Sequence, residues 1–178
     1  MPTFISLLRG INVGGNKRVP MADLKRLYES LGFTQVQTLL QSGNAVFTTD
    51  QTDATALTRL IEDGIQRTFG FTVRIVLRTP DQWRQVIAQH PYSAVQMESP
   101  DKILVLFLAA VPAPEGVAAL LAGVNPPEEA SASGEEVYLY FGEGIGRSKL
   151  STTWIEKQLR TEGTGRNWNT ITKLMNMV

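Results

Sequence analysis

The spacing of hydrophobic residues predicts six elements in the first half of the chain. Residues 3–9 (TFISLLR) have the apolar composition of a strand, and apolar residues then recur at helical spacing from Met21 to Leu31. The segments VQTLLQ and AVFTT flank the turn SGN and predict a hairpin. Asp53 is placed to cap a second helix that ends at Gly70, and TVRIVLR alternates as a half-buried strand. This βαββαβ order is that of a ferredoxin-like lobe.

A short internal repeat supports this order. LGFTQVQTLL begins at residue 31 and FGFTVRIVLR begins at residue 69. In both, the end of a helix, a glycine and the pair Phe-Thr lead into a strand, so the two halves of the first lobe follow one plan.

The second half of the chain has a similar but less regular pattern. Thr79 and Gln82 have the spacing of a capping box around Pro80, which suits the first position of a helix. Residues 103–111 (ILVLFLAAV) form a nearly continuous apolar run, which predicts a strand buried on both faces. PEGVAALLAG, residues 114–123, predicts a short helix.

The last third alternates between loop and helix patterns. Residues 125–136 (NPPEEASASGEE) have the most loop-like composition of the chain, and VYLYF after them predicts a strand. A glycine-rich loop then opens a helix that starts later than Ser148, because Thr153 and Glu156 have capping-box spacing. After Gly163 and Gly165, the sequence RNWNTITKLMNMV predicts a final short helix.

These patterns predict an α+β protein of two ferredoxin-like (βαββαβ-type) lobes, the second irregular, packed into one compact unit. We expect residues 1–79 to form the N-terminal ferredoxin-like lobe and residues 80–178 the C-terminal α+β lobe. The hydrophobic content of 43% is sufficient for a packed core.

Charge is unevenly placed although the formal net charge is zero. Residues 1–26 carry five Lys or Arg against one Asp, and residues 147–178 carry six against two Glu. Residues 90–146 carry one Lys against eight acids. The chain therefore has no bulk field for nucleic acid or membrane, but its two basic ends would make a positive patch if they met in space.

The residue inventory excludes several kinds of chemistry. The chain has no cysteine and one histidine, which excludes disulfides, thiolate nucleophiles and zinc sites of Cys or His ligands. We expect neither a cofactor nor a metal. The first residues lack the basic start and the length of a signal peptide, and no apolar run reaches the ~20 residues of a membrane span. A soluble, cytoplasmic protein without a membrane partner is expected.

The segment LRGINVGGNKRVPM, residues 8–21, raises the question of a phosphate loop. Gly10 and Gly15 have Walker A separation, but Asn16 and Lys17 stand where that loop has Lys and then Ser or Thr. GEGIG at residue 142 has its third glycine one residue too early for a dinucleotide loop. Both loops nevertheless share one arrangement, in which a strand is followed by a glycine-rich turn, then by cations, then by the start of a helix. They take pseudo-equivalent places in the two halves of the chain, and this arrangement favours the binding of anions.

The alternative to anion binding is that these loops are structural. Glycines also serve turns that require positive φ, and exposed cations are often only solvated. Gly43 and Asn44 suit a hairpin turn, and Asn167 suits a helix cap. Trp168 is expected in the core, and Arg166 is the residue that folding explains least. His90, before a proline, is expected in a loop and not as a catalytic base.

Four segments together resemble the bacterial family of domain of unknown function 1697. They are LLRGINVGGNKRVPMADL, LQSGNAVF, RSKL and TGRNWNTITKL, and they extend from residue 7 to residue 174. The resemblance implies ferredoxin-like subdomains but no activity, because the family has no established biochemical role. One departure is HPY at residue 90, where family members commonly have Asn-Pro-Phe.

The first functional hypothesis is a binding module for a phosphorylated small molecule or nucleotide. Its polar cleft would be formed by the two glycine-rich basic loops, with the turn at QSGN and the segment at TGRN. The candidate ligand-binding residues are Arg9, Asn12, Gly14, Gly15, Lys17, Gln41, Ser42, Asn44, Arg147, Ser148, Lys149, Arg166 and Asn167.

Three other hypotheses remain open. A phosphoryl-transfer or hydrolytic enzyme would need few protein groups beyond Lys17 or Lys149, with Ser42 or Ser148 as nucleophile. An RNA-binding module could use Tyr138 and Tyr140 on one sheet face, although the chain has no RNP-like strand. The last is a structural or interaction protein without a ligand. The sequence leaves the oligomeric state open.

Overall fold

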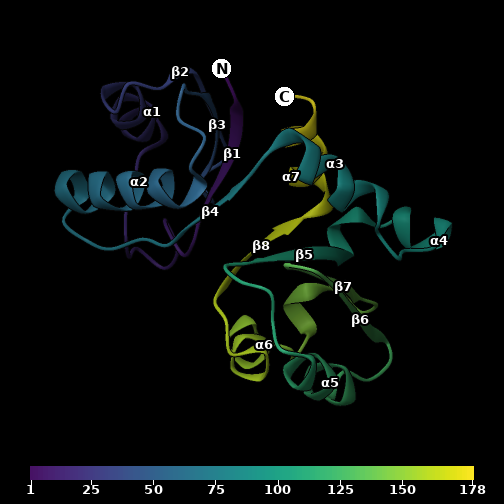
Figure 1. The fold of residues 1–178 in the computed structure, drawn as a ribbon. Helices are drawn as coiled ribbons and strands as arrows, with labels where there is room; N and C mark the ends of the chain where they lie inside the picture. Colours follow the sequence, from purple (N-terminus) through teal and green to yellow (C-terminus); the bar gives the residue numbers. More distant parts are fainter. The chain divides into compact units, whose positions relative to one another are not determined.

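The chain folds into two compact units, each built on a four-stranded sheet (Figure 1). The computed structural model describes residues 1–178. The first unit comprises Met1–Gln85 with Leu174–Val178, and the second comprises Val86–Lys173. The ranges 1–79 and 80–178 expected from the sequence stay a prediction. None of the helices combines the length and the apolar character needed to cross a bilayer.

The first lobe has the predicted ferredoxin-like topology. Its elements are β1 (Thr3–Leu8), α1 (Met21–Ser30), β2 (Thr34–Leu39), β3 (Asn44–Thr48), α2 (Ala54–Phe69) and β4 (Ile75–Arg78). The strand order is β2-β3-β1-β4, and every neighbouring pair is antiparallel. The two βαβ halves therefore interleave, with β1 and β3 in the centre of the sheet.

The core of the first lobe lies between the sheet and its two helices. Phe33 and Phe47 stack with ring centroids 4.3 Å apart, and Tyr28 of α1 meets Phe47 edge-on at 5.4 Å. The Tyr28 hydroxyl shares a buried 2.6 Å hydrogen bond with Ser6 Oγ, so its polar end is satisfied. Burial raises the pKa of Tyr28 well above its ordinary value. Leu57, Ile61 and Ile65 supply the buried stripe of α2.

The second lobe repeats the strand order of the first. Its strands are β5 (Ile103–Leu108), β6 (Glu128–Ser133), β7 (Glu136–Phe141) and β8 (Gly163–Asn167), in the order β6-β7-β5-β8. Helices α5 (Pro114–Gly123) and α6 (Thr152–Leu159) cover one face of this sheet (Figure 1). The fold class is thus confirmed, and the expected irregularity is confined to the connections.

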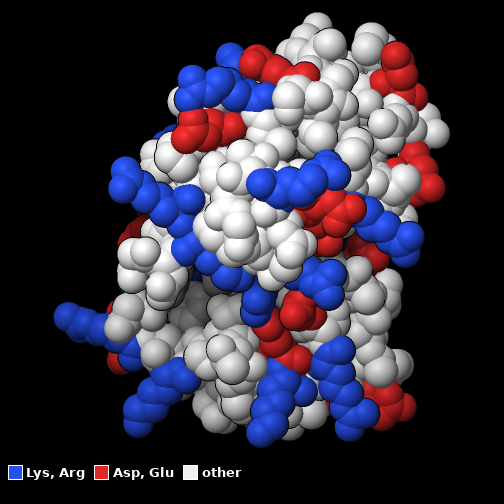
Figure 2. All heavy atoms as spheres, turned by 90° about the vertical axis from the view of Figure 1, so that its left-hand side faces the viewer, with Lys and Arg blue, Asp and Glu red and all other residues white.

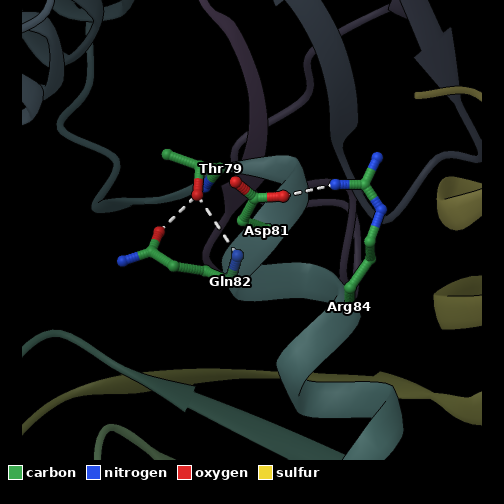
Figure 3. Close-up of polar contacts among 4 residues, drawn as sticks. All are labelled: Thr79, Asp81, Gln82 and Arg84. Carbon is green, nitrogen blue, oxygen red and sulfur yellow. Dashed lines mark hydrogen bonds and ion pairs between the residues drawn. The ribbon is translucent and has the colours of Figure 1, made fainter.

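The connections of the second half consist of short helices. They are α3 (Pro80–Ala88), α4 (Ala94–Met97) and the 3₁₀ turns η1 (Pro100–Lys102) and η2 (Ile145–Arg147). The last helix, α7 (Trp168–Met175), follows β8. The predicted capping box opens α3, with Thr79 N–H donating to Gln82 Oε1 at 2.8 Å and Gln82 N–H to Thr79 Oγ1 at 3.2 Å. Figure 3 shows this box beside the ion pair of Asp81 and Arg84.

Several local predictions agree with the structure in detail. Asp53 caps α2 by accepting from the N–H groups of Thr55 and Ala56, and Gly70 ends that helix with a φ of 82°. The predicted helix at PEGVAALLAG has the bounds of α5. α6 starts after Ser148 as expected, although Ser151 and not Thr153 is its cap.

Two segments differ from the sequence prediction. Residues 125–136, expected as loop, contain β6. Arg166 and Asn167, expected at the start of the last helix, belong with Gly163 and Gly165 to β8, and the helix begins at Trp168. β6 lies at the edge of the sheet, where half-exposed Ala, Ser and Glu suffice because backbone pairing with β7 forms the strand. β8 contains glycines because it packs closely: a Cβ on Gly163 would lie 2.9 Å from Leu106 Cγ and 3.0 Å from the Phe107 carbonyl oxygen.

Candidate functional site

The connection from β1 to α1, which we call the opening loop, contains a miniature hairpin. Asn12 N–H donates to Lys17 O at 3.1 Å, and Asn16 N–H donates to Val13 O at 3.0 Å. Gly14 and Gly15 between them have φ angles of 60° and 76°, the left-handed conformation that both central residues of a type I′ turn require. The turn is therefore the reason for these two glycines, since a Cβ on either would have nothing within 4 Å.

This hairpin is separate from the helix that follows it. α1 begins at Met21 after Pro20, and no side chain caps its first turn. The N–H groups of the glycine turn consequently do not belong to a helix start. The order expected from the sequence, a strand, a glycine turn, cations and a helix, is present, and residues 16–20 separate the glycine turn from the first residue of α1. Anion binding by this loop stays a prediction.

Asn12 holds the base of the hairpin in place. Its Nδ2 donates to Val19 O at 2.9 Å and to Gln41 O at 2.8 Å, and its Oδ1 accepts from Val19 N–H at 2.8 Å. These three bonds use the donors of the amide and its oxygen, so Asn12 connects the opening loop to the β2–β3 turn. These hydrogen bonds explain why an asparagine is found at position 12 without a ligand.

The β2–β3 turn contains the other candidates of the first lobe. Asn44 is fully buried, and its Nδ2 donates to Leu39 O at 2.7 Å and to Ser42 Oγ at 3.1 Å. Gly43 has a φ of 86°, and a Cβ there would lie 2.5 Å from Ile11 Cδ1. The turn chemistry predicted for QSGN thus explains Gly43 and Asn44, while the side chains of Gln41 and Ser42 are exposed.

Three loops meet at this end of the first lobe and bring four cations with them. Lys17 Nζ donates to Thr72 O at 2.9 Å, and Arg9 N–H donates to Arg74 O at 3.0 Å, so the α2–β4 connection contacts the opening loop. We call this region the basic loop end. Its cations are Arg9, Lys17, Arg18 and Arg74.

Exposure differs among these four cations. Lys17, Arg18 and Arg74 are exposed, whereas Arg9 is half-buried. One carboxylate moderates their charge, since Glu62 Oε2 lies 3.7 Å from Arg74 Nη1. Figure 2 shows the molecule from the left of Figure 1, and on this face Lys and Arg side chains are interspersed with Asp and Glu. The positive charge is therefore local.

The second glycine-rich loop has a different place in its lobe. It follows β7, which is the third strand of its lobe in chain order, whereas the opening loop follows β1, which is the first strand of its lobe in chain order. β7 and its neighbour β5 are antiparallel, so a loop after β7 lies at the opposite end of the sheet from a loop after β5. The two loops are not equivalent in the repeated fold, and the symmetry argument for a shared anion site is wrong.

Within the second loop Ser148 is engaged structurally. Its hydroxyl bonds to the carboxylate of Glu128 and accepts from Leu150 N–H at 2.9 Å. Arg147 and Lys149 on either side of Ser148 are exposed.

Arg166 is a buried residue of β8. Only 6% of it is exposed, and its Nη1 donates to Thr164 Oγ1 at 2.8 Å and to Gly165 O at 2.9 Å. Burial lowers the pKa of Arg166 to about 10, which still leaves it charged at neutral pH. The guanidinium thus bonds to its own strand. Asn167 beside it caps α7 as predicted, because its Oδ1 accepts from Thr170 N–H at 2.9 Å.

The sequence argument missed the counterpart of Arg166 in the first lobe. Arg78 on β4 is 5% exposed and donates from Nη1 to Leu77 O at 2.9 Å. Arg78 lies opposite Ile5 of β1, and Arg166 lies opposite Val105 of β5, so both occupy the same register position of the repeated fold. An alignment of the two fourth strands, IVLR and GTGRN, would have revealed the pair.

The aromatic residues of the second lobe form a buried cluster. Tyr138 is 2% exposed, its hydroxyl donates to Val86 O at 2.8 Å, and burial raises its pKa to about 12. Tyr92 packs edge-on against Tyr138 and Trp168, and its hydroxyl donates to Leu139 O at 3.0 Å. His90 lies beside them in a loop, as expected, and accepts from Tyr92 N–H. Tyr138 is therefore inaccessible to stacking on nucleic-acid bases.

Comparison with known proteins identifies the family. The model of a family described as "Protein of unknown function (DUF1697)" matches residues 1–138. The structure of the conserved bacterial protein SP0830 from Streptococcus pneumoniae is similar, with a TM-score of 0.77 and 22% identity over 99% of this chain and 98% of that one. At this identity the likeness shows the fold alone. Among curated proteins, none matches this chain.

Proposed function

This chain belongs to the family of proteins of unknown function DUF1697, and we propose that its basic loop end binds the phosphate group of a small molecule or nucleotide. The observations that support the proposal are the contacts between the loops that carry these cations: Lys17 Nζ donates to Thr72 O, and Arg9 N–H donates to Arg74 O. Arg18 follows Lys17 in the chain and is exposed. Phosphate oxygens accept several charge-assisted hydrogen bonds at once, and clustered cations suit them.

The frame beneath these cations is held by hydrogen bonds, which lowers the entropy lost on binding. Asn12 fixes the opening loop to the β2–β3 turn, and Lys17 fixes it to the α2–β4 connection. Lys17 has three donors, of which the bond to Thr72 O uses one. Arg18 is exposed and carries a planar guanidinium that can bind phosphate through two parallel bonds.

Other groups of the first lobe would complete the recognition. Gln41 and Ser42 are exposed on the β2–β3 turn and offer neutral hydrogen-bonding groups. A contribution from Arg147, Ser148 and Lys149 of the second loop stays a prediction from the sequence.

The test compares ligand-induced thermal shifts of the wild type with those of two single-site variants. The probes are nucleotides, sugar phosphates, polyphosphate and a short RNA, each at two salt concentrations. A ligand at 100 times its Kd stabilises by about 2.7 kcal/mol, which is a shift of a few degrees for a chain of this size. In Arg18→Ala we expect Kd for the same probe to rise about tenfold, the loss of one charge-assisted contact.

Arg59→Ala is the matched control, because Arg59 is an exposed arginine on α2, ten residues before the end of that helix. It is expected to bind like the wild type. An unchanged Kd in Arg18→Ala, or the absence of a shift with every phosphate compound, would overturn the proposal. Binding of RNA alone, with an affinity that falls steeply with salt, would assign the site to nucleic acid instead. Phosphate release from any bound nucleotide would identify phosphoryl-transfer or hydrolytic chemistry.

A further inference from the structure

The second sheet has an open edge at β6. β6 pairs with β7 through an unbroken register from Glu128–Phe141 to Ser133–Glu136, and no strand of the sheet lies on its other side. The unpaired N–H and C=O groups of such an edge can pair with a further strand. β6 contains neither Lys nor Pro, the residues that most often block this pairing.

The corresponding edge of the first lobe is protected. The register of β2 against β3 shifts between Thr34 and Gln37, and Gln35 within that interval has a φ of 52°. A bulge of this kind bends an edge strand and interrupts its hydrogen-bonding row. The repeated fold therefore carries one blunted edge, β2, and one regular edge, β6.

An apolar groove of about 380 Å³ lies at the end of β6 nearest the β6–β7 turn. One wall is the stripe Pro114, Val117, Ala118 and Leu121 of α5, at the spacing of one helix face, and the other wall includes Ala132 and Ser133 of β6. The small side chains of β6 leave the groove open. Leu121 is 43% exposed, so a ligand that covered it would remove apolar surface from water.

The dimensions of the groove suit an extended peptide. Pro114 and Leu121 are seven residues apart on α5, which corresponds to about 10 Å along the helix axis. An extended strand covers that length in about three residues and directs alternate side chains to the same side. Addition of a strand to a sheet edge beside a helix is an established mode of peptide recognition.

Charge indicates the chemistry of the partner. Residues 103–146, which include β5, α5, β6 and β7, contain six Glu and no Lys or Arg. Glu115 lies in the first turn of α5, and Glu129 lies on β6. A segment with Lys or Arg beside its aliphatic residues is complementary to this region. A second copy of β6 is not, because it would bring two further Glu to this acidic region and no aliphatic side chain larger than Ala to the apolar groove.

We propose that an extended peptide segment of a partner protein, with aliphatic side chains at alternate positions and Lys or Arg beside them, adds as a fifth strand to β6 and fills the groove against α5. Backbone pairing would provide the affinity that does not depend on sequence, and the groove would select the aliphatic side chains.

The probes that test this proposal are short, terminally capped peptides in which Val, Ile or Leu alternates with Thr between flanking lysines. Their Kd is measured by fluorescence polarisation with the full chain, and hydrogen exchange of the β6 amides is followed with and without peptide. We expect saturable binding of at least one peptide together with slower exchange in β6. Methylation of the peptide's own pairing N–H groups is expected to raise Kd at least tenfold.

Two substitutions on α5 locate the site. Leu121→Lys replaces a groove residue by a cation, and it is expected to raise Kd at least tenfold. Ala122→Lys adds the same charge at an exposed neighbour that does not line the groove, and it is expected to leave Kd within twofold. Circular dichroism of both variants checks that they fold alike.

Three outcomes would overturn the proposal. The first is the absence of saturable binding across the whole peptide set. The second is binding that N-methylation or Leu121→Lys leaves unchanged, which would place the peptide elsewhere. The third is concentration-dependent self-association that Leu121→Lys abolishes, because a second copy of this chain would then cover the edge.

Discussion

The fourth strands of the two lobes reach the same place in the fold by different means. β4 is IVLR, an aliphatic strand whose pattern predicts its conformation, whereas β8 is GTGRN, which has two glycines and little strand propensity. Both pair with the first strand of their sheet, and both place a buried arginine opposite its third residue. The shared position is that of the arginine, not that of the apolar residues around it.

The difference lies in how closely each strand approaches its neighbours. Gly163 and Gly165 face Leu104, Leu106 and Leu108 of β5, which occupy the space that side chains on β8 would need. In the first lobe Ile75 and Leu77 of β4 fill the equivalent layer themselves. At one opposed pair the bulk has changed strands, because Ser6 of β1 lies opposite Leu77 of β4, whereas Leu106 of β5 lies opposite Gly165 of β8. A close-packed layer therefore constrains the two residues of such a pair together and not the residue type at one position.

The largest effect is expected from removal of the two arginines. Arg78→Ala and Arg166→Ala should each lower the free energy of unfolding by about 2–4 kcal/mol, because each empties a buried volume and leaves buried oxygens without a donor. Urea denaturation followed by circular dichroism measures this loss. A loss in one lobe but not the other would break the equivalence of the two positions.

Arg18→Ala is the control for both arginine variants. Arg18 is exposed on the opening loop, and its removal should change the free energy of unfolding by no more than about 0.5 kcal/mol. A ligand screen with Arg166→Ala could not separate a loss of binding from a loss of stability, because Arg166 is buried and donates a hydrogen bond to its own strand, β8.

A smaller loss is expected when the close approach of β8 is disturbed. Gly163→Ala places a methyl group 2.9 Å from Leu106 Cγ and 3.0 Å from a backbone oxygen, so we expect a cost of about 1–3 kcal/mol. Thermal unfolding provides the measurement. Gly146→Ala is the matched control, because a Cβ there meets nothing within 4 Å and its backbone is not in the left-handed region. Equal melting temperatures for the two variants would contradict the packing explanation.

The two glycine-rich loops offer a finer comparison. Asn12→Ala removes two hydrogen bonds to Val19 within the opening loop and one to Gln41 of the β2–β3 turn, and it should cost about 2 kcal/mol. Ser148→Ala removes one hydroxyl from the second loop and should cost about 1 kcal/mol. Hydrogen exchange should show the loss of protection confined to residues 11–19 in Asn12→Ala. A larger loss of stability in Ser148→Ala than in Asn12→Ala would contradict the expectation that the opening loop is the more rigid of the two loops.

The smallest expected effects concern helix caps in the two units. Asp53→Ala and Ser151→Ala each remove a side-chain cap, from α2 and α6 respectively, and each should cost about 1 kcal/mol. Melting temperatures of the two variants should therefore fall by similar amounts. Thr153→Ala is the control for α6, because Thr153 has capping-box spacing in the sequence but lies within the helix; a loss as large as that of Ser151→Ala would show that the cap is misplaced.

The place and the ligand of the candidate site stay predictions, but the structural roles of several candidate residues can be compared with those expected from the sequence. Sequence alone identified the opening loop, the turn after β2 and the segment before α7 as special. It could not show that Asn12 donates to Gln41 O, because that partner lies 29 residues away in the chain. It also could not show that Arg166 donates to the carbonyl of its neighbour Gly165, because the strand that buries this arginine was not predicted. Arg74 escaped notice because its connection to the opening loop is a tertiary contact.

What the sequence by itself determined is local: the order of most strands and helices, the caps at Asp53 and Thr79, the turns at Gly14 and Gly43, and the family. These depend on hydrophobic period, backbone conformation and hydrogen bonds between residues close in the chain. Tertiary structure alone decided the strands β6 and β8, the burial of Arg78 and Arg166, and the end of each sheet at which a loop lies. Those features depend on which strands pair, and pairing partners supply the hydrogen bonds and the space that a residue's own sequence neighbours cannot.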